Sequence, residues 1–460
     1  MPASCPDGPC PAKAAAAGGA SRIPVAIVGA GLTGMSAAFH LARAGIPCRV
    51  FEREPQPGGH VVTVEERGYR FDRTGHLLHM PGGPERDLAL SWIGPSWREI
   101  ERRSAIWSHG VYTRYPFQAN LFGLPPAVAY ECLQGFVDAH VAPPQAPARN
   151  FEEFCLAHFG RGITERFMVP YNTRLWGVGP TEMTADWCAR FVPVPTLGDV
   201  LAGAVGFANR ELGYNARFIY PERGIGQLSS GLAAALGSVE CSRPLRRIDS
   251  AARELAFDGE RVRFEVLVST IPLPRLVELW DGASAPVRRA AARLRATHLY
   301  YLDVALRTPC GRPYHWIYVP EPRYPFHRVG CYSHFSAQMA PPGTAGLYVE
   351  LSDRQEPDLA SLLPAVADGL CEMGLIARRE AILFARARRL DPAYVVFDHA
   401  CRGAIDSIRP FLAAQRILSC GRYGGWDYSS MADALASGRE AAAQAAALLG
   451  GAQDQDGDAT

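Results

Sequence analysis

A glycine-rich turn that follows a short apolar run places the strongest constraint on the fold of this 460-residue chain. Residues 25–28 read as an apolar strand, and Gly29, Gly31 and Gly34 follow at the spacing GxGxxG. In this pattern the first glycine makes a tight turn, the second lets the backbone approach a pyrophosphate, and the third lets the next helix pack closely on the strand. That helix, expected over residues 33–44, would point its free N–H groups and positive dipole end at the phosphates. The sequence therefore predicts a Rossmann-like dinucleotide site.

Two features further along the chain indicate which dinucleotide is bound. Residues 49–51 are expected to form a second strand that ends at Glu52, whose carboxylate would accept hydrogen bonds from a ribose diol and repel a 2'-phosphate. Gly58 and Gly59 then provide a bend without side chains, along which the chain can pass the cofactor. The arrangement Glu-x5-Gly-Gly resembles the FAD-binding motif of the flavoprotein superfamily that includes amine oxidases and phytoene desaturases. We therefore predict FAD rather than NAD or NADP.

Composition excludes several classes of function. With 48% apolar and 20% charged residues the chain resembles an ordinary soluble globular protein, and a net charge of +1 provides no basic excess for nucleic acid or an anionic membrane. No apolar run approaches the roughly 20 residues that a spanning helix needs. Twelve scattered cysteines without a CxxC pair predict reduced thiols in a cytoplasm and no metal site. Because Lys13 is the only lysine, neither a Schiff-base lysine nor the lysine common near the flavin of amine oxidases is available.

The pattern of apolar residues predicts an α/β protein in which one domain is assembled from three parts of the chain. We expect strands over residues 69–72, 262–271, 299–304, 315–319, 346–351 and 416–420, and helices over residues 358–373, 378–384 and 432–449. Residues 87–140 read as helical and loop-like, and residues 151–201 as a helical block. The predicted organisation is a Rossmann-like FAD-binding domain (residues 23–110, 206–290 and 391–450), a mostly helical substrate domain (111–205), an antiparallel β-sheet substrate domain (291–390) and flexible tails (1–22 and 451–460).

Seven segments between residues 24 and 447 resemble, in the same order, those of eukaryotic-type UDP-galactopyranose mutases. They are residues 75–76, 115–120, 167–176, 214–218, 316–318, 325–328 and 421–428. The resemblance implies a non-redox use of FAD, in which N5 of the reduced flavin attacks the anomeric carbon of a nucleotide sugar and expels the diphosphate. The sugar ring then opens and recloses, so that pyranose and furanose forms interconvert. The expected substrate is UDP-galactopyranose or a related nucleotide sugar, and NADH or NADPH is the expected reductant.

The same resemblance implies roles for individual residues. Arg328, His76 and Arg422 are the expected catalytic residues, with Arg328 on the diphosphate, Arg422 at flavin and substrate, and His76 beside the flavin. Gly75 and Asp433 join His76, Arg422 and the glycines and acid named above as cofactor-binding residues. The expected substrate-binding residues are Phe117 and Gln118, which would clamp the uracil, together with Asn172, Trp176, Asn215, Trp316, Tyr318, Arg328 and Tyr428.

Two positions depart from the family pattern. Phe191 stands where the family has an arginine, although Arg190 precedes it, and Cys401 stands where the family has a phosphate-contacting tyrosine. Loss of one charge-assisted contact costs about 1.5–3 kcal/mol, which is enough to alter substrate preference. Two other readings therefore stay open: an FAD-dependent oxidase or dehydrogenase of the amine oxidase or protoporphyrinogen oxidase type, and a flavin-binding protein without catalytic activity.

Overall fold

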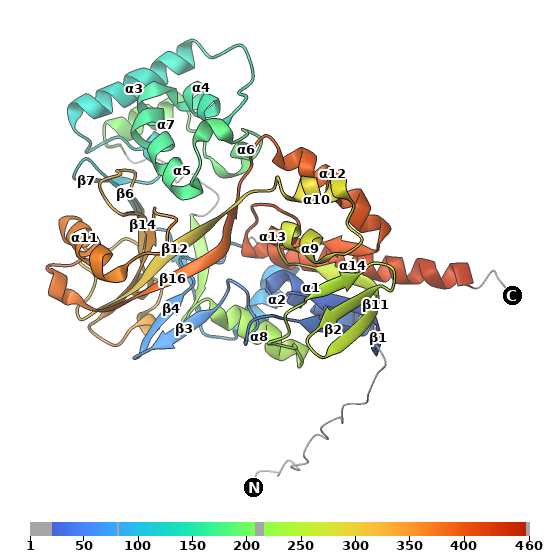
Figure 1. Ribbon diagram of the computed structural model, residues 1–460. Coiled ribbons are helices and arrows are strands. Elements are labelled where there is room, and N and C mark those ends of the chain that lie inside the picture. Colours follow the sequence, from blue (N-terminus) through green and yellow to red (C-terminus); the bar gives the residue numbers. More distant parts are fainter. Residues whose placement is uncertain (1–20, 81, 208–215, 457–460) are drawn as a thin grey trace, which may run out of the picture.

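The computed structural model describes residues 21–80, 82–207 and 216–456, with side chains described to residue 450. Figure 1 shows three bodies: a nucleotide-binding sheet covered by helices, a second and longer sheet, and a lobe of helices above it. The long paired strands β12 (Ala296–Leu306) and β16 (Ile382–Val395) belong to the second sheet and extend toward the nucleotide-binding part. The predicted α/β fold with a Rossmann-like domain is confirmed.

The nucleotide-binding sheet has the strand order β2-β1-β11-β10-β9, and β17 pairs with β11. Its strands are β1 (Ser21–Val28), β2 (Cys48–Phe51), β9 (Arg247–Asp249), β10 (Glu254–Phe257), β11 (Glu260–Ser269) and β17 (Ile417–Ser419). Pairs β1–β2, β1–β11 and β11–β17 are parallel. Successive side chains of a strand point to opposite faces: Val25 and Ile27 pack on one helical layer, Ala26 and Val28 on the other. Burial of both faces explains the continuous apolar run that marks β1 in the sequence.

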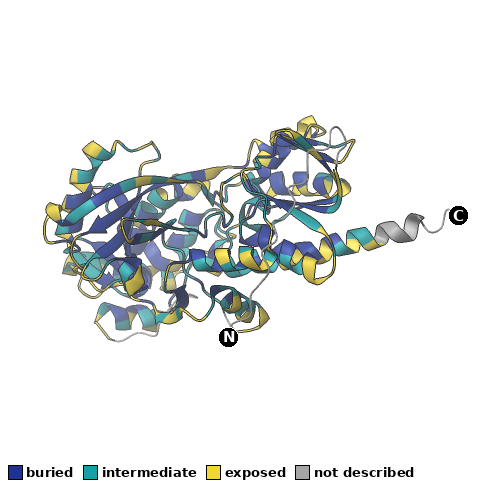
Figure 2. Ribbon diagram, turned by 90° about the horizontal axis from the view of Figure 1, so that it is seen from below, coloured by how far each residue is buried: buried dark blue, intermediate teal, exposed yellow. Residues whose placement is uncertain are grey.

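Helices cover both faces of this sheet. One layer contains α1 (Leu32–Arg43), α2 (Pro84–Ile93), α8 (Gly226–Leu236) and α14 (Met431–Asp456). The other contains α9 (Leu273–Leu279), α10 (Ala285–Ala291) and α12 (Cys401–Ala414). Figure 2 shows the strands as buried and the outer faces of the helices as exposed. β1 begins within the predicted N-terminal tail, and α14 continues to Asp456 within the predicted C-terminal tail.

The second sheet has seven strands in the order β16-β12-β15-β14-β13-β6-β7, and all its pairs are antiparallel except β13–β6. Its other strands are β6 (Ser104–Ser108), β7 (Val111–Arg114), β13 (Trp316–Tyr318), β14 (Phe326–Cys331) and β15 (Ala345–Leu351), and α11 (Leu359–Glu372) packs against it.

Two secondary-structure predictions fail around this sheet. The helix expected over residues 378–384 is a single 3-10 turn, Arg379–Ala381, followed by β16, because long-range pairing with β12 overrides local helix propensity. The stretch expected to be helical and loop-like contains β5 (Trp97–Glu101), β6 and β7. β6 and β7 also extend the antiparallel sheet into residues assigned to the two preceding domains.

The helical lobe contains the helical block predicted over residues 151–201 and also includes the preceding helix α3. It comprises α3 (Pro126–Val141), α4 (Phe151–Ile163), a π-helical turn (Thr164–Met168), α5 (Val169–Trp176), α6 (Cys188–Phe191) and α7 (Leu197–Ala204). The hairpin β3 (Thr63–Glu66) and β4 (Tyr69–Asp72), the strand β8 (Arg217–Pro221), which pairs with β5, and the short α13 (Gly421–Gly424) complete the part that surrounds the site. Among the described helices none is both long and apolar enough to cross a membrane.

Candidate functional site

A cavity of about 2120 Å³ lies where the nucleotide-binding sheet, the second sheet and the helical lobe meet. Its walls include Gly29 and Glu52 from the first body, Tyr318 and Arg328 from the second, and Trp176 from the third. Pockets for single small molecules usually measure roughly 300–1,000 Å³. This cavity therefore has room for a dinucleotide and a second ligand together.

The glycine turn forms one end of the cavity. Gly29 has φ +99°, and a Cβ there would collide with the hydroxyl of Thr270. A Cβ on Gly34 would collide with the carbonyl oxygen of Gly29, so this glycine lets α1 pack on β1 without lining the cavity. Gly31 precedes α1 as its N-cap, and a Cβ there would meet nothing within 4 Å. The space beside Gly31 is the place where a phosphate can approach the helix N-terminus.

Glu52 and the Gly58–Gly59 bend lie against this turn. The buried Glu52 carboxylate accepts hydrogen bonds from the backbone N–H groups of Ala30 (2.8 Å) and Glu54 (2.9 Å), and it lines the cavity. A Cβ on Gly59 would lie 3.2 Å from the Cα of Gly31, so a side chain there would crowd the turn. Gly31, Glu52 and Gly59 are spaced along the sequence but thus form one continuous part of the cavity wall.

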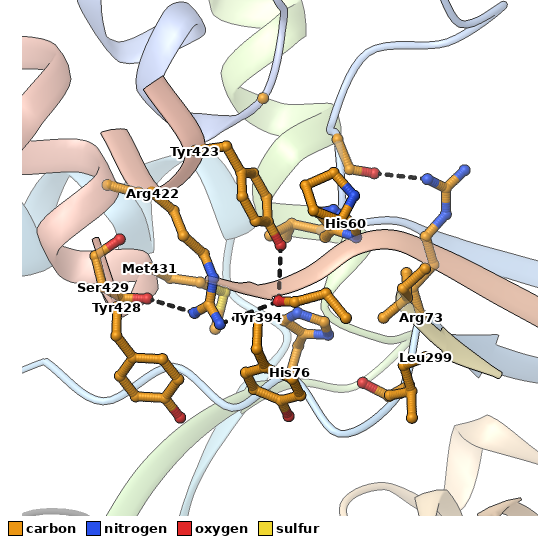
Figure 3. Close-up of a pocket in the computed structure, with 18 of the residues that line it drawn as sticks. His60, Arg73, His76, Leu299, Tyr394, Arg422, Tyr423, Tyr428, Ser429 and Met431 are labelled. Atoms are coloured by element: carbon orange, nitrogen blue, oxygen red, sulfur yellow. Dashed lines mark hydrogen bonds between the residues drawn. The ribbon is translucent and has the colours of Figure 1, made fainter. Parts of the chain in front are cut away.

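Two half-buried histidines, His60 and His76, stand further along the cavity, near Tyr394 and Arg422 (Figure 3). Burial and then the charge of Arg422 lower the pKa of His76 to about 4. Burial, with His76 and Arg422, lowers the pKa of His60 to about 3. The Nδ1 atoms of both rings are buried without a hydrogen-bond partner among the described residues. Both histidines are therefore neutral at pH 7 and have a ring nitrogen available to a ligand.

Arg422 projects from α13 into the cavity, between Tyr423, Tyr428 and Tyr394 (Figure 3). Its Nη1 donates to the backbone carbonyl of Ser429 (2.9 Å) and its Nη2 to that of Ala393 (3.3 Å), whereas its Nε is buried without a partner. No acidic side chain of the described residues forms an ion pair with it. Burial opposes the charge, but the surrounding tyrosines raise the pKa of Arg422 above its usual value. A partly desolvated guanidinium without a carboxylate partner is unfavourable unless an anion binds it.

Arg328, on β14, has a different environment. Its Nε and Nη2 donate to the two oxygens of the fully buried Glu350 carboxylate (2.8 and 2.6 Å), and Nη2 also donates to the Tyr394 hydroxyl (3.2 Å). Burial would raise the pKa of Glu350, but Arg328 and the neighbouring His327, whose Nε2 lies 3.4 Å away, lower it to about 2. Glu350 therefore compensates the charge of Arg328 and fixes the orientation of its guanidinium at the cavity wall.

Aromatic side chains line the region around these arginines. The Tyr428 ring lies 6.1 Å from Tyr394, 5.9 Å from Trp176 and 4.7 Å from Phe191. Tyr318 stacks on Tyr115 at 5.0 Å. All of these side chains line the cavity.

Phe117 was expected to stack on a uracil base, but the structure places it elsewhere. Its side chain is fully buried, stacks on Phe167 at 4.9 Å and is not part of the cavity wall. Phe167 lines the cavity instead. An aromatic residue beside a proline is thus a core residue here, and the sequence could not show which of the two rings faces the ligand space.

The remaining predicted site residues fall into three groups. The cavity wall contains Gly75, Gln118, Asn172, Trp316 and Asp433. The amide of Gln118 donates to the Pro193 carbonyl (2.8 Å), and that of Asn172 to the Met168 carbonyl (2.8 Å). Gly34 packs behind the wall, and Asn215 lies outside the described residues.

The two departures from the family pattern have different consequences. Phe191 and Arg190 both line the cavity, and Arg190 Nη2 donates to Asp433 (2.6 Å), the acid that also caps the start of α14. Arg190 therefore stands beside the Phe191 position, but its charge is paired with that of Asp433. Cys401 is the first residue of α12; it is buried in the core and does not line the cavity, whereas Tyr394 of β16 does.

Several cavity residues were not identified from the sequence. They include His60, Arg73, Tyr171, Tyr394 and Tyr423. His60 directly follows the glycine pair, which is a local signal that could have found it. Tyr394 has no such signal, because it reaches the site only through the pairing of β16 with β12.

Comparison with known proteins identifies the nucleotide-binding part of the chain first. Residues 27–88 match the family model of the NAD(P)-binding Rossmann-like domain. A phytoene dehydrogenase of Streptomyces griseus is 47% identical over 57 residues, 12% of this chain and 11% of that protein. A protein named as a probable UDP-galactopyranose mutase of Klebsiella pneumoniae is 21% identical over 184 residues, 35% of this chain and 43% of that protein. The chain thus matches only about a tenth of the length of the first of these relatives and less than half of the second.

A solved structure extends the similarity to nearly the whole chain. A crystal structure of reduced UDP-galactopyranose mutase superimposes with a TM-score of 0.88 and 26% sequence identity, covering 93% of this chain and 94% of the other. The protein therefore has a fold similar to that of UDP-galactopyranose mutase, with a Rossmann-like dinucleotide-binding domain.

Proposed function

We propose that this protein is an FAD-dependent sugar-nucleotide mutase that interconverts pyranose and furanose forms of a nucleotide sugar. UDP-galactose is the first candidate substrate, and NADH or NADPH the candidate reductant. The observation that carries the proposal is Arg422, a half-buried cation in the cavity with a buried Nε and no acidic partner among the described residues. The similarity to reduced UDP-galactopyranose mutase over 93% of the chain supports it.

The cavity suits FAD in shape and chemistry. Gly31 leaves open space at the N-terminus of α1 for a pyrophosphate, and the buried carboxylate of Glu52 lies beside it to accept hydrogen bonds from a ribose. The unpartnered Nδ1 atoms of His60 and His76 provide polar contacts further along the cavity for the flavin. When bound and reduced, FAD supplies the nucleophile toward the sugar.

The arginine and tyrosine cluster suits the diphosphate of the substrate. Arg422 offers its charge, and the hydroxyls of Tyr394 and Tyr428 stand beside it as hydrogen-bond donors. Arg328 is held rigidly by Glu350, so its contribution is a preorganised donor at a fixed position. Charge that develops on the departing diphosphate is stabilised by groups that need not move.

The walls around the cluster exclude water and position the rest of the substrate. Trp176 and Phe191 pack against Tyr428 and shield the guanidinium of Arg422. Asn172 and Gln118 offer amide groups to sugar or base, and Phe167 offers a ring for stacking. Neutral His76 can donate or accept one hydrogen bond at the flavin without adding charge.

The test is an isomerisation assay with chemically reduced enzyme. Purified FAD-loaded protein is reduced with dithionite under anaerobic conditions, incubated with UDP-galactofuranose, and the nucleotide sugars are separated by chromatography. Appearance of UDP-galactopyranose only with reduced enzyme supports the proposal, and Arg422→Met is the matched control for the site. A panel of other UDP-hexoses and UDP-pentoses, monitored by flavin absorbance, identifies the preferred sugar. If reduced enzyme neither converts any of them nor binds UDP, the proposal is wrong.

An oxidase or dehydrogenase gives the opposite pattern. Such an enzyme would reoxidise rapidly with oxygen or another acceptor during turnover of an amine or polyene, and UDP would leave its flavin spectrum unchanged. Lys13 is the only lysine of the chain, so no described residue could serve as a flavin-adjacent lysine. Stopped-flow measurement of flavin reduction by candidate substrates separates the two classes.

A further inference from the structure

A cluster of metal-ligand side chains lies outside the cavity. Among the described residues, Cys310, Cys331 and His334 each place a ligand atom within 4.8 Å of those of the other two. None of the three lines the cavity, and the proposed function uses none of them. Two sulfurs and one imidazole nitrogen make up a ligand set that soft and borderline metal ions prefer.

The fold brings these residues together from two segments. Cys310 lies in the turn that follows β12, whereas Cys331 ends β14 and His334 ends the 3-10 turn Tyr332–His334. A backbone hydrogen bond from Cys331 N to His315 O (2.9 Å) joins the segments. Because Cys310 precedes Cys331 by 21 positions and no CxxC pair is present, ligand spacing in the sequence gave no signal of a metal site.

The histidine is held in the tautomer that a metal ligand needs. Its Nδ1 lies 2.8 Å from the backbone carbonyl of Tyr314. A carbonyl oxygen can only accept, so Nδ1 carries the proton and Nε2 keeps its lone pair. Donation of the second ring nitrogen to a carbonyl is the usual support of a metal-bound histidine.

Backbone amides also face both sulfurs. The N–H groups of Ser333 and His334 donate to the sulfur of Cys331, and that of Arg312 donates to the sulfur of Cys310. The Cys-x-x-His spacing turns the chain so that these amides point back at the cysteine. Cys331 is 2% exposed, whereas Cys310 and His334 are half-buried, so a metal ion can enter from the solvent side.

We propose that Cys310, Cys331 and His334 bind one zinc ion, with a fourth coordination position open to water. Zinc–sulfur and zinc–nitrogen bonds of about 2.3 and 2.1 Å place tetrahedral ligand atoms roughly 3.6–3.8 Å apart, so a contraction of at most about 1 Å completes the site. The ion would tie the turn after β12 to the end of β14, the strand that carries Arg328. The ion would lie outside the cavity that holds the proposed chemistry.

The test measures metal content and affinity in the full-length, FAD-loaded protein, purified under reducing conditions with a tag that binds no metal. We expect one zinc per chain by mass spectrometry of the metal, and a cobalt-substituted protein with ligand-field bands beyond the flavin absorbance. Cys331→Ser and His334→Ala should each weaken zinc binding by more than about 100-fold, since even loss of a supporting partner costs 10- to 100-fold.

Matched controls distinguish this cluster from other thiols. Cys371→Ser removes a half-buried cysteine elsewhere, and the double variant Cys5→Ser, Cys10→Ser removes two thiols outside the described residues; both should keep full zinc affinity. If the site variants fail to fold, zinc should protect two thiols of the unaltered protein from a thiol reagent. Zinc that persists in Cys331→Ser, or reduced protein that binds none, overturns the proposal. So does a Cys310–Cys331 disulfide combined with no metal binding after reduction.

Discussion

Replacement of Arg422 by methionine separates the effect of its charge on folding stability from its effect on ligand binding. Methionine keeps much of the side-chain length but removes the charge and the two hydrogen bonds to the carbonyls of Ser429 and Ala393. Loss of these bonds costs about 1–3 kcal/mol. Removal of a half-buried charge that has no acidic partner offsets this loss, because desolvation of an unpaired ion is unfavourable. We therefore expect the melting temperature of the ligand-free variant to be unchanged or higher.

Ligand binding should respond in the opposite direction. If Arg422 contacts the diphosphate, its removal costs about 1.5–3 kcal/mol for a charge-assisted hydrogen bond. Since about 1.4 kcal/mol corresponds to a tenfold change in affinity, the Kd of UDP should rise roughly 10- to 150-fold. Arg422→Lys keeps the charge and should recover part of this loss.

The assay combines thermal unfolding with calorimetric titration of UDP. The samples compared have the same flavin occupancy, as measured by the ratio of flavin to protein absorbance. A stable variant with weakened UDP binding supports the assignment. The reasoning is wrong if Arg422→Met loses stability by several degrees while its UDP affinity stays normal, because the guanidinium would then be a purely structural group.

Three further perturbations test other parts of the site. Arg328→Met leaves the fully buried Glu350 unpaired and should cost about 3–5 kcal/mol of stability. The second substitution Glu350→Gln in the same chain should restore most of this loss. Equal melting temperatures for the single and the double variant would contradict the expectation. Gly31→Ala should fold normally but lose FAD, because its Cβ points into open space, whereas Gly34→Ala should lose about 1–3 kcal/mol of stability through collision with the preceding turn. Flavin content and unfolding curves distinguish the two. His76 has a pKa of about 4 in the fold and about 6.5 when unfolded, so only the unfolded state takes up its proton between these values and stability falls as the pH drops from 6.5 to 4. His76→Gln should make the melting temperature less dependent on pH in this window, and an unchanged slope would refute the assignment.

The nucleotide-binding half of the protein was predictable because its signals are local. The strand, the three glycines, α1 and Glu52 fall within about 30 consecutive residues, and each is required by backbone geometry at its own position. The resemblance of short segments that occur in the same order as in the mutase family added residues such as Arg422 and Tyr428 to the predicted site. The structure brings these residues to one cavity. Local propensity failed at β16, where pairing with β12 decides the conformation.

Side-chain environments depend on contacts that no local pattern records. Whether Phe117 or Phe167 faces the cavity depends on how the helical lobe packs, and the neutral state of His76 depends on its burial beside Arg422. By contrast, Arg328 is neutralised by Glu350 only because β14 pairs with β15.

The sequence by itself thus determined that a dinucleotide is held and where, because steric demands at glycine and the position of one acid are properties of adjacent residues. Only the tertiary structure decided which of two arginines lacks an acidic partner among the described residues, which tyrosine stands beside both, and that two distant cysteines meet one histidine. Charge compensation, burial and ligand geometry are set by distances between strands far apart in the chain, and these distances exist only after the sheets and helices have packed.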